Sequence, residues 1–100
     1  MIDDETQINE NQTQDTYSIE EILNGILALA KDVVKNEDEI QITNAVVIRK
    51  FSSNFLSFNS LYSKIIIIKS LNKVQVFSKS PDKMGNYGLP KREFTGFIKA

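Results

Sequence analysis

The pattern of apolar and polar positions centres on four consecutive isoleucines, Ile65–Ile68, with a lysine at either end. A half-buried strand alternates apolar and polar residues, so an unbroken β-branched run predicts a strand that is covered on both faces. Each fully buried isoleucine contributes about 1.5–3 kcal/mol. The run therefore predicts the central strand of a small sheet, and the rest of the chain must supply a cover for each face.

Residues 18–35 have the pattern of an amphipathic helix. Ser18-Ile19-Glu20-Glu21 has the form of a capping box, and Tyr17 and Ile22 are placed for a hydrophobic staple. Gly25 costs up to about 1 kcal/mol inside a helix, which a close crossing over a strand would explain. Apolar side chains recur at three- and four-residue spacing, namely Ile19, Ile22, Leu23, Ile26, Leu27, Ala30, Val33 and Val34. We expect this helix to cover one face of the sheet.

Residues 40–50 read as an extended segment in which Asn44 marks a bulge or a break. The alternation predicts that one side carries Ile40, Ile42, Val46 and Ile48, and that the other carries Gln41, Thr43, Ala45, Val47 and Arg49. After the isoleucine run, a short turn leads into a strand over residues 74–79, which predicts a β-hairpin. Residues 80–90 form an exposed loop, and residues 93–98 close the chain as an edge strand.

Residues 51–60 fit two descriptions. The spacing of Phe51, Phe55 and Phe58 suits a short helix, whereas four serines and two asparagines suit a loop. In one interpretation these phenylalanines cover the second face of the sheet. In the other they form an exposed aromatic platform.

The predicted fold class is α+β, with one N-terminal amphipathic helix packed on a small, mainly antiparallel sheet of three to five strands. Residues 1–16 are rich in acidic and amide side chains and predict a flexible acidic tail. Residues 17–100 are expected to form a single α+β domain.

Composition removes several kinds of chemistry. The 100 residues contain no cysteine and no histidine, which excludes disulfides, thiolate chemistry and zinc sites of the Cys/His kind. The usual nucleophile–base sets are absent, so we expect no enzymatic activity, no catalytic residues, no cofactor and no metal site. The acidic N-terminus does not resemble a signal peptide, and no apolar run approaches the roughly 18 residues of a membrane span. These features favour a cytoplasmic protein without a membrane partner.

Charge is divided unevenly along the chain. Residues 1–40 hold eleven acidic residues against Lys31 and Lys35, a net charge of −9, whereas residues 41–100 carry +8. This asymmetry has two interpretations: the halves attract each other within the fold, or a basic face binds nucleic acid.

The leading functional prediction is a small interaction or regulatory protein, of the kind that mobile elements encode. This prediction rests on the isoleucine strand. A single helix covers one face of the sheet, and residues 51–58 are a doubtful cover for the other. A partner protein or a second copy, as in a homodimer, would complete the burial.

The alternative is binding of single-stranded nucleic acid by the basic C-terminal half. Single-strand binders combine positive charge with stacking rings. The candidate binding residues are Lys64, Lys69, Lys73, Lys79, Lys83, Tyr87, Lys91 and Arg92. Lysine greatly outnumbers arginine here, although arginine is the usual choice for bidentate recognition of phosphate and bases.

Overall fold

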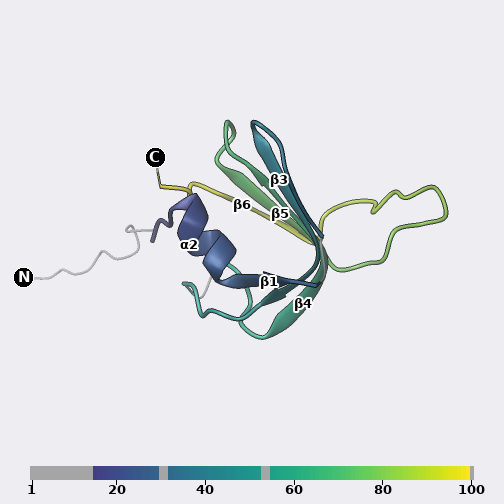
Figure 1. The fold of residues 1–100 in the computed structure, drawn as a ribbon, viewed down its shortest axis with the longest axis horizontal. Helices are drawn as coiled ribbons and strands as arrows, with labels where there is room; N and C mark the ends of the chain where they lie inside the picture. Colours follow the sequence, from purple (N-terminus) through teal and green to yellow (C-terminus); the bar gives the residue numbers. More distant parts are fainter. Residues whose placement is uncertain (1–14, 30–31, 53–54, 100) are drawn as a thin grey trace, which may run out of the picture.

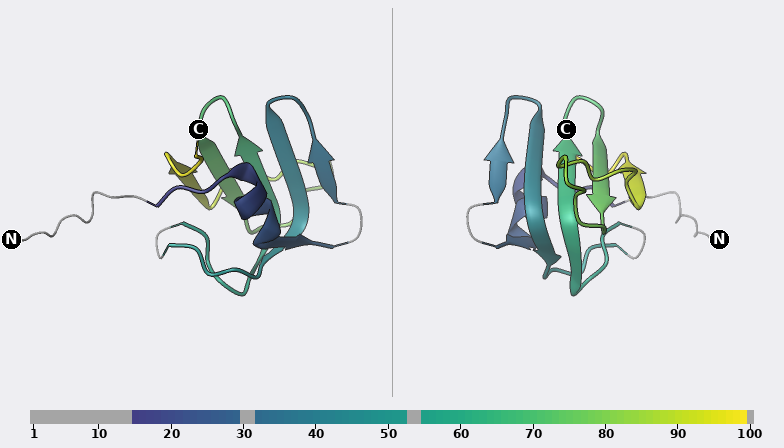
Figure 2. Two further views of the ribbon diagram at one scale, coloured as in Figure 1. Left: turned by 60° about the vertical axis from the view of Figure 1, so that its left-hand side comes forward. Right: turned by 90° about the vertical axis from the view of Figure 1, so that its right-hand side faces the viewer.

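The computed structural model describes residues 15–29, 32–52 and 55–99 as one strongly bent antiparallel sheet with a single short helix in that part of the chain (Figure 1). The elements in chain order are α2 (Ile19–Asn24), β1 (Ile26–Ala28), β2 (Val33–Lys35), β3 (Glu39–Val47), β4 (Ser60–Ile68), β5 (Lys73–Phe77) and β6 (Arg92–Thr95). The strand order is β1-β3-β4-β5-β6, and β2 also pairs with β3. Figure 2 shows β2 and β6 at opposite sides of the sheet.

The predicted α+β class, with a long helix over residues 18–35 on three to five strands, is wrong. The sheet has six strands, and α2 has only six residues. The start of the helix is as predicted, because both capping-box hydrogen bonds form. The Glu21 N–H donates to Ser18 Oγ at 3.1 Å, and the Ser18 N–H donates to Glu21 Oε1 at 2.9 Å.

The helix ends early because Gly25 turns the chain into the sheet. Its carbonyl accepts the Ile48 N–H of the neighbouring segment at 2.8 Å, and residues 26–28 then pair with β3. Val33 and Val34, which had been assigned to the helix, belong to β2 and pair with Ile42 and Gln41. The backbone groups of these residues are satisfied by β3 instead of by a continuation of α2 to residue 35.

Asn44 breaks the alternation of β3, as its position in the sequence suggested. It adopts a left-handed backbone conformation with φ 55°, which asparagine tolerates better than most residues. The buried side chains are therefore Ile40 and Ile42 before it, and Ala45 and Val47 after it. The prediction that Val46 and Ile48 lie on the same side as Ile40 and Ile42 is wrong, because the break exchanges the two faces.

The isoleucine run is a strand, but only one of its faces is fully covered. Ile65 and Ile67 are completely buried, whereas Ile66 and Ile68 are partly exposed on the outer face. Gln41 and Gln75 flank Ile66 on the neighbouring strands. Polar neighbours therefore shield the outer face in part, and no second layer is needed to explain the run. The predicted hairpin is confirmed, since β4 pairs with β5 from Ile68–Lys73 to Lys64–Phe77.

The segment over residues 51–60 forms no helix in its described part, 51–52 and 55–60. Phe51 and Phe55 are buried, but they join the core on the concave side of the sheet. Phe55 stacks on Tyr17 and Phe97 and meets Phe51 and Phe94 edge-on. The segment thus covers the same face as α2, and of its three phenylalanines only Phe58 is exposed.

The two ends of the described chain lie side by side. The Tyr17 N–H donates to the Phe97 carbonyl at 2.8 Å, and the Lys99 N–H donates to the Tyr17 carbonyl at 2.7 Å. These bonds form a parallel bridge between Tyr17 and Ile98. Most of the predicted acidic tail, residues 1–14, lies outside the described residues.

Asp38 joins two turns at one end of the sheet. Its carboxylate accepts the Ser70 hydroxyl at 2.6 Å and the Ser70 N–H at 2.8 Å, which lowers the pKa of Asp38 from its ordinary value of 3.8. Because the pKa is lower in the folded state, this carboxylate contributes stability at neutral pH. That contribution disappears as the pH falls through the lowered pKa.

We expect Asp38→Asn to be less stable than the wild type at about pH 7 and to lose less additional stability on acidification to about pH 2. Urea midpoints measured across this range test the expectation. Glu37→Gln is the matched control, because Glu37 is exposed and makes no hydrogen bond within the described part of the chain. An unchanged acid dependence in Asp38→Asn would show that the Ser70 contacts do not matter.

Candidate functional site

The free edge formed by β1 and β2 carries an unusual concentration of apolar side chains. Both strands pair with β3 on one side, and no described residue pairs with their other side. Leu27, Leu29, Val33 and Val34 are each between 40% and 54% exposed. Natural sheets usually protect an edge with charge, proline or a covering element. We call this free side of β1 and β2 the open edge.

The backbone of β2 is also available for pairing. The Asp32 carbonyl accepts the Thr43 N–H, and the Asn36 N–H donates to the Glu39 carbonyl, each at 2.8 Å. Because backbone groups alternate in direction along an antiparallel strand, those of Val33 and Lys35 point away from β3. The open edge therefore presents donors and acceptors that pair with no described residue, together with apolar side chains.

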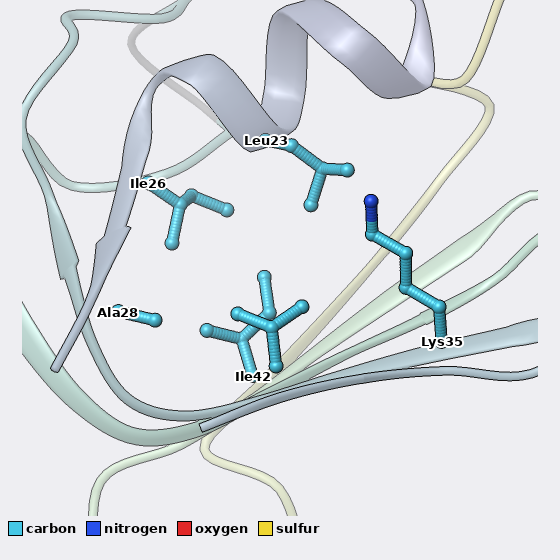
Figure 3. A pocket seen from close by; sticks show the side chains of 6 residues that line it. Leu23, Ile26, Ala28, Lys35 and Ile42 are labelled. Carbon is cyan, nitrogen blue, oxygen red and sulfur yellow. The ribbon is translucent and has the colours of Figure 1, made fainter. Parts of the chain in front are cut away.

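A hollow of about 560 Å³ lies beside the open edge, between α2, β1 and the β2–β3 ladder. Five apolar side chains and one lysine line it: Leu23, Ile26, Ala28, Val33, Ile42 and Lys35. Figure 3 shows Leu23 and Ile26 facing Ile42 across the space, with Lys35 along one side and its nitrogen toward α2. This volume is in the range of about 300–1,000 Å³ that is typical of ligand sites. A few apolar side chains of a bound molecule would fit into it.

The outer face next to the open edge is apolar as well. Leu27 pairs with Val46, and Val46 pairs with Leu61, so that the three side chains form a row across β1, β3 and β4. Leu27 and Leu61 are both exposed. A polypeptide placed along the open edge would therefore find apolar surface on either side of the sheet.

A second surface is the loop between β5 and β6, residues 78–91, which we call the basic loop. Figure 1 shows it projecting from the sheet on the side opposite α2. It contains four of the eight predicted binding residues, Lys79, Lys83, Tyr87 and Lys91. Its acidic member, Asp82, organises the tip by accepting the N–H groups of Met84 and Asn86, each at 2.9 Å.

Tyr87 anchors the basic loop to the outer face of the sheet. Its ring lies 5.9 Å from that of Phe77, and Lys64 Nζ lies 4.8 Å from its centroid. Phe77 is buried, although it is not part of the main core cluster. The ring of Tyr87 is therefore engaged within the molecule, which reduces its value as a free stacking surface.

The structure does not bring all the predicted basic residues together. Arg92 begins β6 next to the loop, and its guanidinium lies over the Phe94 ring at 4.7 Å. Lys69 and Lys73 lie at the other end of the β4–β5 hairpin. There, Lys73 Nζ is 4.0 Å from Glu93 Oε1, and the Lys69 N–H donates to the Asp38 carbonyl. These two lysines do not belong to the same surface as the loop.

Within residues 15–29, 32–52 and 55–99, no group of three or more acidic side chains is arranged to hold a metal ion. No helix in that part of the chain is long and apolar enough to cross a membrane. Comparison with protein-family models, curated proteins and solved structures gave no match.

Sequence reasoning missed the open edge because it assigned residues 26–35 to a helix. A signal was nevertheless present. Asn24-Gly25 is a poor helix interior, and Val33-Val34 is a β-branched pair. Together they favour a short helix followed by strands.

Proposed function

We propose that this chain is a non-enzymatic interaction protein that binds another polypeptide along the open edge. An extended segment of the partner pairs with the outward backbone groups of Val33 and Lys35, and its apolar side chains enter the hollow. The observation that carries this proposal is the combination of unpaired backbone and exposed apolar side chains on the same two strands. Strand addition uses these two features together, the first for affinity and the second for specificity.

The energetics are consistent with a useful affinity. Covering the remaining exposed surface of Leu27, Val33 and Val34 contributes on the order of 1 kcal/mol per side chain. Filling the hollow and pairing the backbone add to this gain. The total must exceed the entropic cost of association, so that a partner with a preorganised segment is favoured.

A photo-crosslinking amino acid at Val34 tests the proposal in cells that express the protein. We expect a discrete protein adduct from position 34 and none from the exposed control position Ser57, which lies on a different segment. Val33→Pro is expected to reduce the yield of the adduct by about tenfold, because a proline on an edge strand has no N–H to pair with a partner. The N–H of Val33 points away from β3, so the substitution removes no hydrogen bond within the sheet. The thermal midpoint of Val33→Pro controls for folding.

The identity of the adduct separates the outcomes. A second copy or a different protein supports the proposal, provided that Val33→Pro removes the adduct. No adduct from position 34, or an adduct that Val33→Pro does not change, overturns it.

Binding of single-stranded nucleic acid is a second candidate function, and the grouping of Lys79, Lys83 and Lys91 on one projecting loop favours it. An electrophoretic shift with random oligonucleotides at about 50 and 200 mM salt tests it, because affinity that depends on phosphate contacts falls steeply over this range. Lys83→Ala is expected to weaken the shift and to flatten its dependence on salt. The absence of a shift at the lower salt concentration removes this candidate.

A further inference from the structure

The two most exposed large apolar side chains of the described residues lie on the basic loop. Met84 is 84% exposed and Leu89 is 92% exposed. An apolar side chain at a loop tip is commonplace when it is single, but two on one projecting arm form a candidate contact surface. The loop thus offers apolar groups that the fold of its own molecule does not use.

The tip of the loop is held in one shape. Asp82 and Asn86 close it with a backbone hydrogen bond of 2.8 Å, and the Gly85 N–H donates to the Asp82 carbonyl at 3.0 Å. Gly85 and Gly88 have φ values of 85° and 74°, a region that glycine enters without strain. A tip that is already ordered loses little conformational entropy when it binds.

Charge complements this loop at the open edge. Lys79, Lys83, Lys91 and the adjacent Arg92 outnumber Asp82 in the loop, whereas Asp32 precedes β2 and Glu37, Asp38 and Glu39 follow it. The hollow between them is apolar, and Lys35 is its one charged lining residue. A basic arm with an apolar tip therefore matches an apolar hollow whose β2 wall is flanked by carboxylates, and the one like charge that the arm meets in the hollow is Lys35.

The two matching surfaces belong to different sides of the molecule. The basic loop projects away from the side of the sheet that holds α2, and the hollow lies between α2, β1 and the β2–β3 ladder (Figures 1 and 3). One molecule does not bring them together. We propose that the basic loop of one copy docks in the hollow of a second copy, with Met84 and Leu89 inserted. This inference rests on the proposed function and specifies its partner.

Docking of this kind is head-to-tail, because two different surfaces meet. Such an assembly has one free loop at one end and one free hollow at the other until a ring closes, and an assembly that does not close grows as a filament. We therefore expect masses above that of a dimer as the concentration rises. The association constant should fall several-fold between about 0.1 and 1 M salt, as the Debye length falls from about 10 to 3 Å.

Complementation between two variants tests the proposal. Met84→Ser combined with Leu89→Ser disables the loop and leaves the hollow intact, whereas Val33→Lys disables the hollow and leaves the loop intact. In analytical ultracentrifugation, each variant alone is expected to be monomeric, and an equimolar mixture is expected to form a one-to-one dimer that grows no further. Leu71→Ser, at an exposed apolar residue in the β4–β5 turn, is the control that should assemble like the wild type.

Each other result overturns the inference in a recognisable way. A dimer that is lost in Val33→Lys but kept in the loop variant indicates that two open edges pair symmetrically. That result overturns the inference but is consistent with the proposed function. A wild type that is monomeric at all concentrations also overturns the inference, and crosslinking at Val34 then decides whether the edge binds a different protein. If the wild type is monomeric and the loop variant binds an oligonucleotide more weakly than the wild type does, the basic loop is a nucleic-acid-binding surface. Circular dichroism and thermal midpoints confirm that each variant is folded.

Discussion

Replacing Gly25 by alanine is expected to lower the free energy of unfolding by about 1–3 kcal/mol, the usual cost of forcing extra atoms into a packed core. A Cβ at this position would meet the Phe51 ring, with Cε2 at 2.7 Å, and Arg49 Cβ at 2.8 Å. Phe51 is buried and cannot move away freely. The backbone of Gly25 is in the right-handed region, with φ −91°, so the penalty comes from crowding alone.

Chemical denaturation of Gly25→Ala measures this cost, and the neighbouring exposed residue provides a control. Asn24→Ala is expected to change stability by less than about 0.5 kcal/mol. Adding Phe51→Leu to Gly25→Ala should recover part of the loss, because the smaller side chain relieves the contact, and a double-mutant cycle isolates that coupling. If Gly25→Ala instead stabilised the protein by about 0.4–1 kcal/mol, as glycine replacement does at unstrained and open sites, the close approach to Phe51 would be refuted.

Replacing Phe55 by alanine is expected to cost about 3–5 kcal/mol, the usual range for truncating a buried phenylalanine. Phe55 is 1% exposed and contacts four other aromatic rings. The distance between ring centroids is 4.6 Å for Phe97 and 5.4 Å for Tyr17 and Phe51. Since total stabilities of small domains are about 5–15 kcal/mol, the variant should be close to unfolding at 37 °C. Its thermal midpoint and near-ultraviolet circular dichroism report this loss.

Phe58→Ala is the matched control for that experiment. Phe58 is three residues further along the same segment and is 49% exposed. Its removal is expected to change stability by less than about 0.5 kcal/mol. Equal losses in the two variants would contradict the packing described for this segment.

Local signals in the sequence were reliable where a few neighbouring residues decide the conformation. The capping box at Ser18 and Glu21 and the β4–β5 hairpin are both governed by short-range contacts and were predicted correctly. The length of the helix was indicated only by the weaker signals of Asn24-Gly25 and Val33-Val34. Ile26 and Ala28 fit the three-to-four spacing of a helix and also the alternation of a short strand, and pairing with β3 decides between them.

The covering of the sheet also depended on long-range packing. The isoleucine run indicated burial on both faces, but Ile66 is partly exposed, and the polar side chains of Gln41 and Gln75 flank it without a second layer. Phe55 is drawn to the concave side because Tyr17, Phe94 and Phe97 gather there from both ends of the chain. No local pattern contains that information.

For the candidate site, the sequence located the charge but not the apolar surface. Lys79, Lys83 and Lys91 were recognisable as basic residues of one exposed loop. The open edge could not be seen, because its exposure depends on which strand lies next to β3 and on the absence of a described strand beyond β2. Exposed apolar side chains do occur, but they lie on β1, on β2, on the basic loop and at other positions instead of on the isoleucine run.

The bridge between Tyr17 and Ile98 has a consequence for biosynthesis. Tyr17, which precedes α2, is held by backbone bonds to Phe97 and Lys99, about 80 residues away along the chain. During translation, the β3–β4–β5 hairpins can form as they leave the ribosome, but the aromatic cluster around Phe55 lacks Phe94 and Phe97 until they emerge. The nascent chain therefore carries an incomplete aromatic cluster until Phe94 and Phe97 have left the ribosome.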